Sequence, residues 1–121
     1  MGNFRKLRVW DIAQQIVIDA DQATSKMRGA RAASLRDQLM RAAMSVSTNI
    51  VERSSQRSPR EFARYLGYAI GSVSELEGHV QMARDLKMIA QPDFKSLLGR
   101  IVDVRMMLYG LLKKLKDDSH A

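Results

Sequence analysis

The chain has 121 residues, a formal net charge of +7 and a pI near 10.1. Its 45% of hydrophobic and 27% of charged residues are typical of one ordinary globular domain, and they argue against a disordered or fibrous chain. The absence of cysteine excludes disulfides, thiolate catalysis and cysteine-bound zinc or iron–sulfur sites. The positive charge favours polyanionic partners such as nucleic acid, although the same charge can serve solubility alone.

The sequence carries no signal of export or of membrane attachment. The opening MGNFRKLRVWDIAQQ lacks the apolar centre of a signal peptide. The uncharged run at residues 42–51 is far shorter than the roughly 20 apolar residues of a membrane span. Lys6 occupies a position where the myristoylation pattern needs Ser or Thr. We therefore expect a cytoplasmic protein with no membrane partner, forming one domain over residues 1–121 with a short disordered N-terminal arm and C-terminal tail.

Apolar residues recur with the helical period of about 3.6 residues along almost the whole chain, which predicts an all-α fold. The first helix is predicted over residues 7–27 and is closed by Gly29. The second is predicted over residues 32–54, and polar residues such as Asn49 and Arg53 enter its apolar stripe near the end.

The third helix has the clearest start. Ser58 as N-cap, Pro59 at the first helical position and Glu61 three residues after the cap predict a capping box, which pairs backbone N–H groups at the helix start. Pro92 opens a leucine-rich fourth helix that runs into the tail KKLKDDSHA, where the lysines suit the negative end of the helix dipole. Four helices with short connections predict an antiparallel up-down-up-down four-helix bundle.

Small residues are spaced along one face of the predicted third helix, and others lie along the second. We expect them to pack these two helices closely rather than to line a ligand cleft, because each glycine inside a helix costs about 1 kcal/mol unless packing offsets it. They are Gly67, Gly71, Ser74 and Gly78, facing Ala42, Ser45 and Thr48. Large apolar residues outside the core stripes predict a subunit interface: Trp10, Tyr65, Tyr68, Ile70, Met106, Met107 and Tyr109.

The chain offers little for catalysis or metal binding. Di-iron bundles carry Glu-x-x-His pairs, but His79 has Leu76 three residues before it and the only other histidine, His120, lies in the tail. No nucleophile system or glycine-rich phosphate loop is present. We therefore expect no enzyme, no metal and no cofactor. A residual enzymatic hypothesis rests on Glu75, Glu77 and His79 acting at a subunit interface.

The segment NIVERSSQRSPREF, residues 49–62, concentrates polar side chains at the predicted turn between the second and third helices. Two arginines precede this turn four residues apart, and two more follow it with the same spacing. Together with the start of the third helix they form a candidate phosphate-binding corner. The four are Arg53, Arg57, Arg60 and Arg64.

A structural interpretation of the same corner remains open beside the functional one. Glu52 and Glu61 could pair with Arg57 and Arg53 and fix the turn, with Asn49 hydrogen-bonded inside the bundle. In either case we expect Asn49, Glu52, Ser58 and Glu61 to brace the corner.

Further basic residues lie at both predicted ends of the bundle. Arg5, Lys6 and Arg8 precede the first helix and supplement the arginine corner, whereas the turn at the opposite end carries Arg28, Arg31 and Arg36. Charge at both ends suits contacts with phosphates more than the reading of a base sequence.

Four stretches of the chain resemble, in order, the four-helix-bundle proteins encoded within intervening sequences of bacterial 23S ribosomal RNA genes. The stretches are FRKLRVWDIA, LRDQLMRAAMSVSTNIVE, RSPREFARYLGYAIGSVSELEGHVQMARDL and MMLYGLLKKL. The most specific matches include Asn49-Ile50, Glu52, Arg57, Glu61-Phe62 and Gly71-Ser72. Two positions depart from the family pattern: Ser47 stands where a proline is usual, and Arg53 where a glycine is usual, so the second helix could continue further before the corner.

The resemblance implies a homopentameric bundle that binds RNA or other nucleic acid and has no known catalytic activity. A related bundle is an accessory protein of the reverse transcriptase of diversity-generating retroelements. This keeps a second hypothesis open, in which the chain is a protein-interaction scaffold or accessory subunit without direct nucleic-acid binding.

Overall fold

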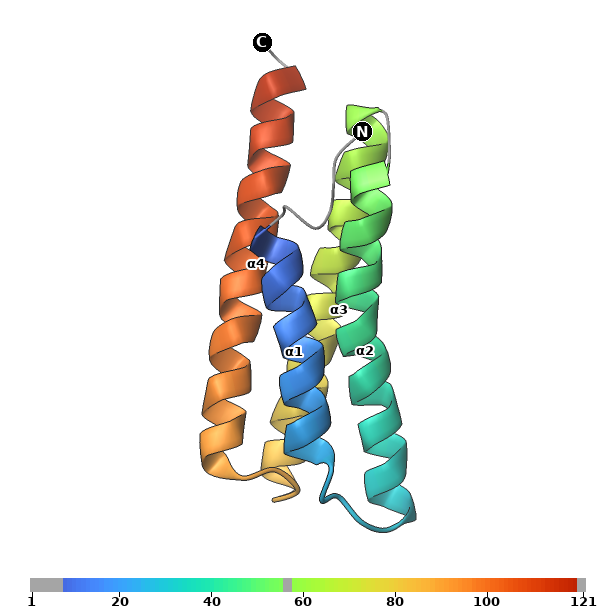
Figure 1. Ribbon diagram of the computed structural model, residues 1–121, viewed down its shortest axis with the longest axis vertical. Coiled ribbons are helices and arrows are strands. Elements are labelled where there is room, and N and C mark those ends of the chain that lie inside the picture. Colours follow the sequence, from blue (N-terminus) through green and yellow to red (C-terminus); the bar gives the residue numbers. More distant parts are fainter. Residues whose placement is uncertain (1–7, 56–57, 120–121) are drawn as a thin grey trace.

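The structure is a computed structural model that describes residues 8–55 and 58–119, without the side chains of residues 53–55 and 119. Four helices fill these ranges, and each runs antiparallel to the next in the chain (Figure 1). Each helix also packs against the next, and α1 packs against α4. The predicted all-α four-helix fold is confirmed. The helices are α1 Arg8–Thr24, α2 Ala30–Ser55, α3 Pro59–Asp85 and α4 Gln91–Ser119.

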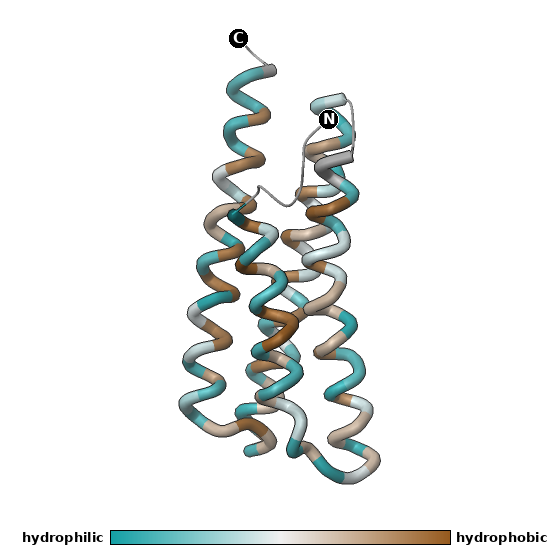
Figure 2. Tube along the Cα trace, in the orientation of Figure 1, coloured by the Kyte–Doolittle hydropathy of each residue, from teal (hydrophilic) through white to brown (hydrophobic). Residues whose placement is uncertain are grey.

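The core consists of one apolar stripe from each helix. Residues spaced by three or four positions turn to the same side of a helix, and hydrophilic and hydrophobic residues alternate along all four helices (Figure 2). Burial of each large aliphatic side chain contributes about 1.5 to 3 kcal/mol relative to its exposure. The largest buried side chains include Ile16 of α1, Leu39, Val46 and Ile50 of α2, Leu66, Val73, Leu76 and Val80 of α3, and Leu97, Ile101, Val104 and Leu108 of α4. None of the described helices is apolar over a long enough stretch to cross a membrane.

The connection between α1 and α2 differs from the prediction. α1 ends at Thr24, where the N–H groups of Ser25 and Met27 bond to carbonyls three residues earlier and tighten the chain into a turn. Gly29 has φ +91 and accepts a hydrogen bond from the N–H of Ala33 at 2.9 Å. It therefore begins α2 rather than closing the first helix as predicted.

The predicted glycine packing between α2 and α3 is wrong. Gly67, Gly71 and Gly78 are exposed, and a Cβ atom added to any of them would meet no other atom within 4 Å. The contact between α2 and α3 is instead made by core side chains and by a 2.8 Å hydrogen bond between the hydroxyls of Ser45 and Ser72. The glycines share one helical face, as their spacing indicated, but that face points away from the core.

Within the described residues, α1 is shorter than the three other helices. Its 17 residues extend about 25 Å, whereas the 27 of α3 and the 29 of α4 extend about 40 Å or more. α1 starts well below the level at which α2 ends, α3 starts and α4 ends (Figure 1). We call that end, formed by residues 52–55, 58–64 and 111–119, the three-helix end. Leu111, Leu112 and Leu115 remain only partly buried there.

α2 continues without a break through Ser47 and Arg53, in line with the absence of the family's proline and glycine.

Candidate nucleic-acid interface

The start of α3 has the Ser58 half of the predicted capping box. Ser58 has an extended backbone, with φ −104 and ψ 143, and its hydroxyl oxygen accepts a hydrogen bond from the N–H of Glu61 at 3.1 Å. Pro59 follows at the first helical position, where its missing N–H is no loss. Because a helix start otherwise leaves N–H groups without a partner, this cap fixes where α3 begins.

Glu61 has a partner that the sequence analysis did not include. Its carboxylate lies 2.6 Å from a guanidinium nitrogen of Arg64, three residues further along α3. Both side chains are over a third exposed, so the ion pair contributes about 1 kcal/mol at most. Glu61 was predicted to pair with Arg53, and Glu52 with Arg57. The side chains of both arginines lie outside the described residues.

Three of the seven predicted nucleic-acid-binding residues are described. Arg60 and Arg8 are exposed, and the side chain of Arg64 is half-exposed. Arg8 lies against α4 beside Met107 and Leu111, away from the start of α3. The side chains of the other four lie outside the described residues: Arg5, Lys6, Arg53 and Arg57.

The three-helix end brings lysines of α4 to the arginines of α3. Arg60 and Pro59 line an open cleft of about 390 Å³ together with Leu115 and Lys116. Lys113, one turn before Lys116, is exposed on the same end of α4. From their position in the sequence, these lysines were expected only to interact with the helix dipole. The signal that could have found them is topological, because antiparallel neighbours place the end of α4 beside the start of α3.

Helix dipoles contribute less at this end than the isolated start of α3 would suggest. The positive N-terminal end of α3 lies beside the negative C-terminal ends of α2 and α4. Partial charges of opposite sign at this spacing largely offset one another. Attraction for an anion must therefore come from the arginine and lysine side chains.

At the opposite end of the bundle, most arginines are engaged within the fold. Arg36 pairs with Asp21 at 2.5 Å, across from α2 to α1. Arg28 donates hydrogen bonds to the carbonyls of Ser25 and Met27 at 3.0 and 3.2 Å, where α1 ends. These contacts hold the connection between α1 and α2, so Arg36 and Arg28 have structural partners.

Asn49 belongs to a hydrogen-bond chain between α2 and α3. Its amide donates to the backbone carbonyl of Ser45 at 2.9 Å and to the Ser45 hydroxyl at 3.2 Å. The Ser45 hydroxyl in turn bonds to Ser72 of α3. Glu52, one turn after Asn49, is exposed. The chain of bonds places Asn49 in the position expected for a structural brace.

The three residues of the enzymatic hypothesis do not converge on one site. Glu77 pairs with Arg105 of α4 and accepts a hydrogen bond from Gln81. Glu75 and His79 are a separate pair, with 3.6 Å between Nε2 of His79 and the Glu75 carboxylate. Over residues 8–55 and 58–119, no cluster of three or more acidic or histidine side chains could hold a metal ion.

Comparison with known proteins agrees with the bundle. A solved structure described as a protein with unknown function from the S23 ribosomal protein family of Bacteroides thetaiotaomicron is similar with a TM-score of 0.78. It is 16% identical, over 87% of this chain and 98% of that one, so the likeness shows the fold alone. No curated protein matches. A family model described as 23S rRNA-intervening sequence protein matches residues 5–110. The chain therefore belongs to the 23S rRNA-intervening sequence protein family.

Proposed function

We propose that this chain is a non-enzymatic, homo-oligomeric bundle that binds structured RNA or other nucleic acid through contacts to phosphates at the three-helix end. The observation that carries the proposal is the cleft that is lined by Arg60 of α3 and Lys116 of α4. The name of the family, 23S rRNA-intervening sequence protein, supports RNA as the polyanion.

Charge and exposure both support this surface. Arg60, Lys113 and Lys114 are exposed, and within the described part of the chain none of them is paired with a carboxylate. Guanidinium and ammonium groups that remain accessible can exchange their counterions for the phosphates of a nucleic acid. We keep in the proposed interface the basic residues that the sequence predicted, and we add three lysines of α4: Arg53, Arg57, Arg60, Arg64, Arg5, Lys6 and Arg8, joined by Lys113, Lys114 and Lys116.

The test is the salt dependence of binding to a labelled structured RNA, followed by fluorescence anisotropy at about 50 and about 200 mM salt. Each phosphate contact contributes about 0.7 to 0.9 to the slope of log K against log salt. The double variant Arg60→Gln, Lys113→Gln should therefore bind more weakly and lose roughly 1.4 to 1.8 from this slope.

The matched control removes the same charge from the opposite end, in the variant Lys26→Gln, Lys95→Gln. Both lysines are exposed. Its slope should stay within about 0.5 of that of the unaltered protein if contacts at the three-helix end dominate. Equal losses in the two variants would show that binding follows net charge alone. Absence of binding at the lower salt concentration would reject the proposed function.

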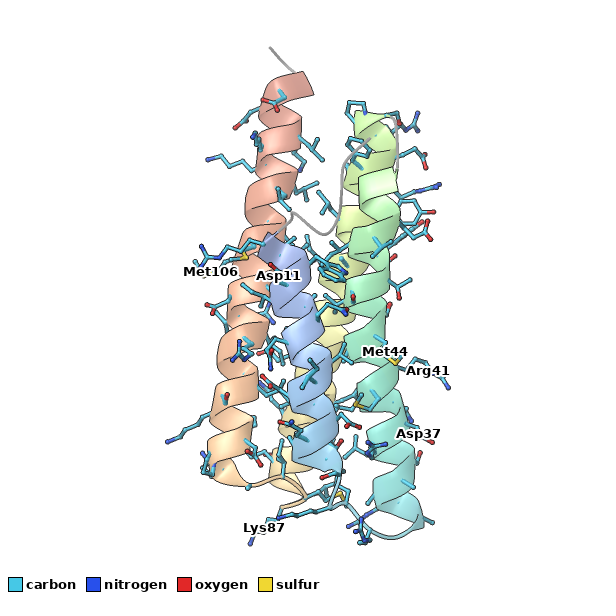
Figure 3. All side chains as sticks on the ribbon, viewed as in Figure 1. Asp11, Asp37, Arg41, Met44, Lys87 and Met106 are labelled. Atoms are coloured by element: carbon cyan, nitrogen blue, oxygen red, sulfur yellow. The ribbon has the colours of Figure 1, made fainter. Side chains whose placement is uncertain are left out.

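Exposed apolar residues favour self-association and keep the scaffold hypothesis open. Tyr68, Met106 and Tyr109 are 52, 68 and 53% exposed, and Met106 projects away from α4 (Figure 3). Trp10, Ile70 and Met107, which were predicted in the same group, pack partly against the core. A homo-oligomer, with the pentamer of the resemblance as its expected form, would cover Met106 and leave Tyr68 and Tyr109 accessible. Sedimentation equilibrium measures the mass of the assembly and so tests the homo-oligomer. Copurification of a defined protein without RNA would favour the scaffold hypothesis over nucleic-acid binding.

A further inference from the structure

We propose that Tyr68 is a stacking platform for an unpaired nucleobase of a single-stranded segment whose phosphates contact Arg64 and Arg60. This inference rests on the proposed function and specifies the part of the nucleic acid that the surface recognises. Phosphate contacts alone would accept any nucleic acid, whereas a stacking residue selects strands with accessible bases.

The first observation is the position of the ring. Tyr68 lies four residues after Arg64 and eight after Arg60, so the three side chains follow one stripe of α3 at steps of about 6 Å. The stripe begins at the three-helix end, and Tyr68 is 52% exposed. A strand that binds the two arginines is thereby directed along α3 toward the ring.

The second observation is that the ring is held from one side. The rings of Tyr65 and Tyr68 meet edge to face, with centroids 5.5 Å apart and planes at 90°. The Arg64 guanidinium lies 5.3 Å from the centroid of the Tyr65 ring. Such contacts each favour one orientation. The tyrosine is therefore partly ordered before a base arrives, which lowers the entropy lost on binding.

The third observation is the open space beside the ring. Gly67 precedes Tyr68, and Gly71 lies one turn further along the same face of the helix. A Cβ atom added to either glycine would meet no other atom within 4 Å. At these two positions, described side chains other than those of the chain neighbours do not crowd the surface of α3 beside the ring. Glu75, two turns after Tyr68 on the same stripe and exposed, sets a negative boundary to the path of the strand.

The experiment compares two RNA ligands of equal length, a blunt duplex and a single strand, with the full chain and the variant Tyr68→Leu. Leucine keeps an apolar side chain and removes the π-face. Loss of one stacked base should weaken single-strand binding by roughly 5- to 150-fold and leave duplex binding within about twofold. Tyr68→Phe and Tyr68→Trp should retain single-strand affinity within about threefold, because both keep an aromatic ring. A deoxyribose version of the strand reports whether the sugar matters.

Tyr109→Leu is the matched control, since Tyr109 is 53% exposed but lies on α4. The inference is overturned if Tyr68→Leu leaves single-strand affinity unchanged, if it weakens duplex and single strand equally, or if Tyr109→Leu causes the same loss. It is also overturned if Tyr68→Leu lowers the mass of the assembly, because the ring would then lie between copies. Failure of the proposed function has a different signature, in which the unaltered chain binds neither ligand at low salt.

Discussion

Replacing the exposed glycines of α3 with alanine should stabilise the protein. Gly67, Gly71 and Gly78 lie inside a helix, where alanine is favoured over glycine, and the space around each is open. Each substitution should add about 0.4 to 1 kcal/mol to the free energy of unfolding. The triple variant therefore gains roughly 1 to 3 kcal/mol, which for a chain of this size raises the melting midpoint by about 4 to 12 °C.

Urea denaturation followed by circular dichroism, repeated over a range of protein concentrations, measures this gain. Gly29→Ala is a control of opposite sign: the space around Gly29 is equally open, but its φ of +91 is strained for alanine. That variant should lose about 1 to 2 kcal/mol. A triple variant less stable than the unaltered chain would refute the reasoning. If its assembly also dissociated, another copy of the chain must cover the glycine face.

Two smaller predictions concern the ends of α3. Lys87, labelled in Figure 3, has φ +59. The N–H of Lys87 bonds to the carbonyl of Arg84 at 2.9 Å, and the N–H of Met88 bonds to the carbonyl of Ala83 at 2.8 Å. This is the Schellman arrangement, in which the position of Lys87 is usually occupied by glycine. Lys87→Gly should raise the free energy of unfolding by about 0.5 to 1 kcal/mol in thermal melts, and a loss of stability would contradict this. Ser58→Ala removes the hydroxyl that caps α3 and should lower the free energy of unfolding by about 1 kcal/mol in the same assay. Ser58→Asn should restore most of this loss, because asparagine also caps helices. If Ser58→Ala were as stable as the unaltered chain, the cap would be dispensable.

Features decided by neighbouring residues were predictable from the sequence, and those decided by packing were not. The cap at Ser58 depends on a residue three positions away, so the pattern alone located the start of α3. The face occupied by Gly67 and Gly71 depends on which side of α3 meets α2, and spacing along one helix does not contain that information. Lys116 lies in the cleft with Arg60 for a related reason, since the contact joins residues more than fifty positions apart.

The distribution of ion pairs separates two groups of basic residues that look alike in the sequence. Arg36 and Arg100 pair with Asp21 and Asp19 of α1, so their charges are largely neutralised within the bundle. At the three-helix end, Arg60 pairs with no carboxylate of the described residues. Affinity for a polyanion should therefore depend on which positive charges are removed, and the net charge of +7 is a poor guide to it.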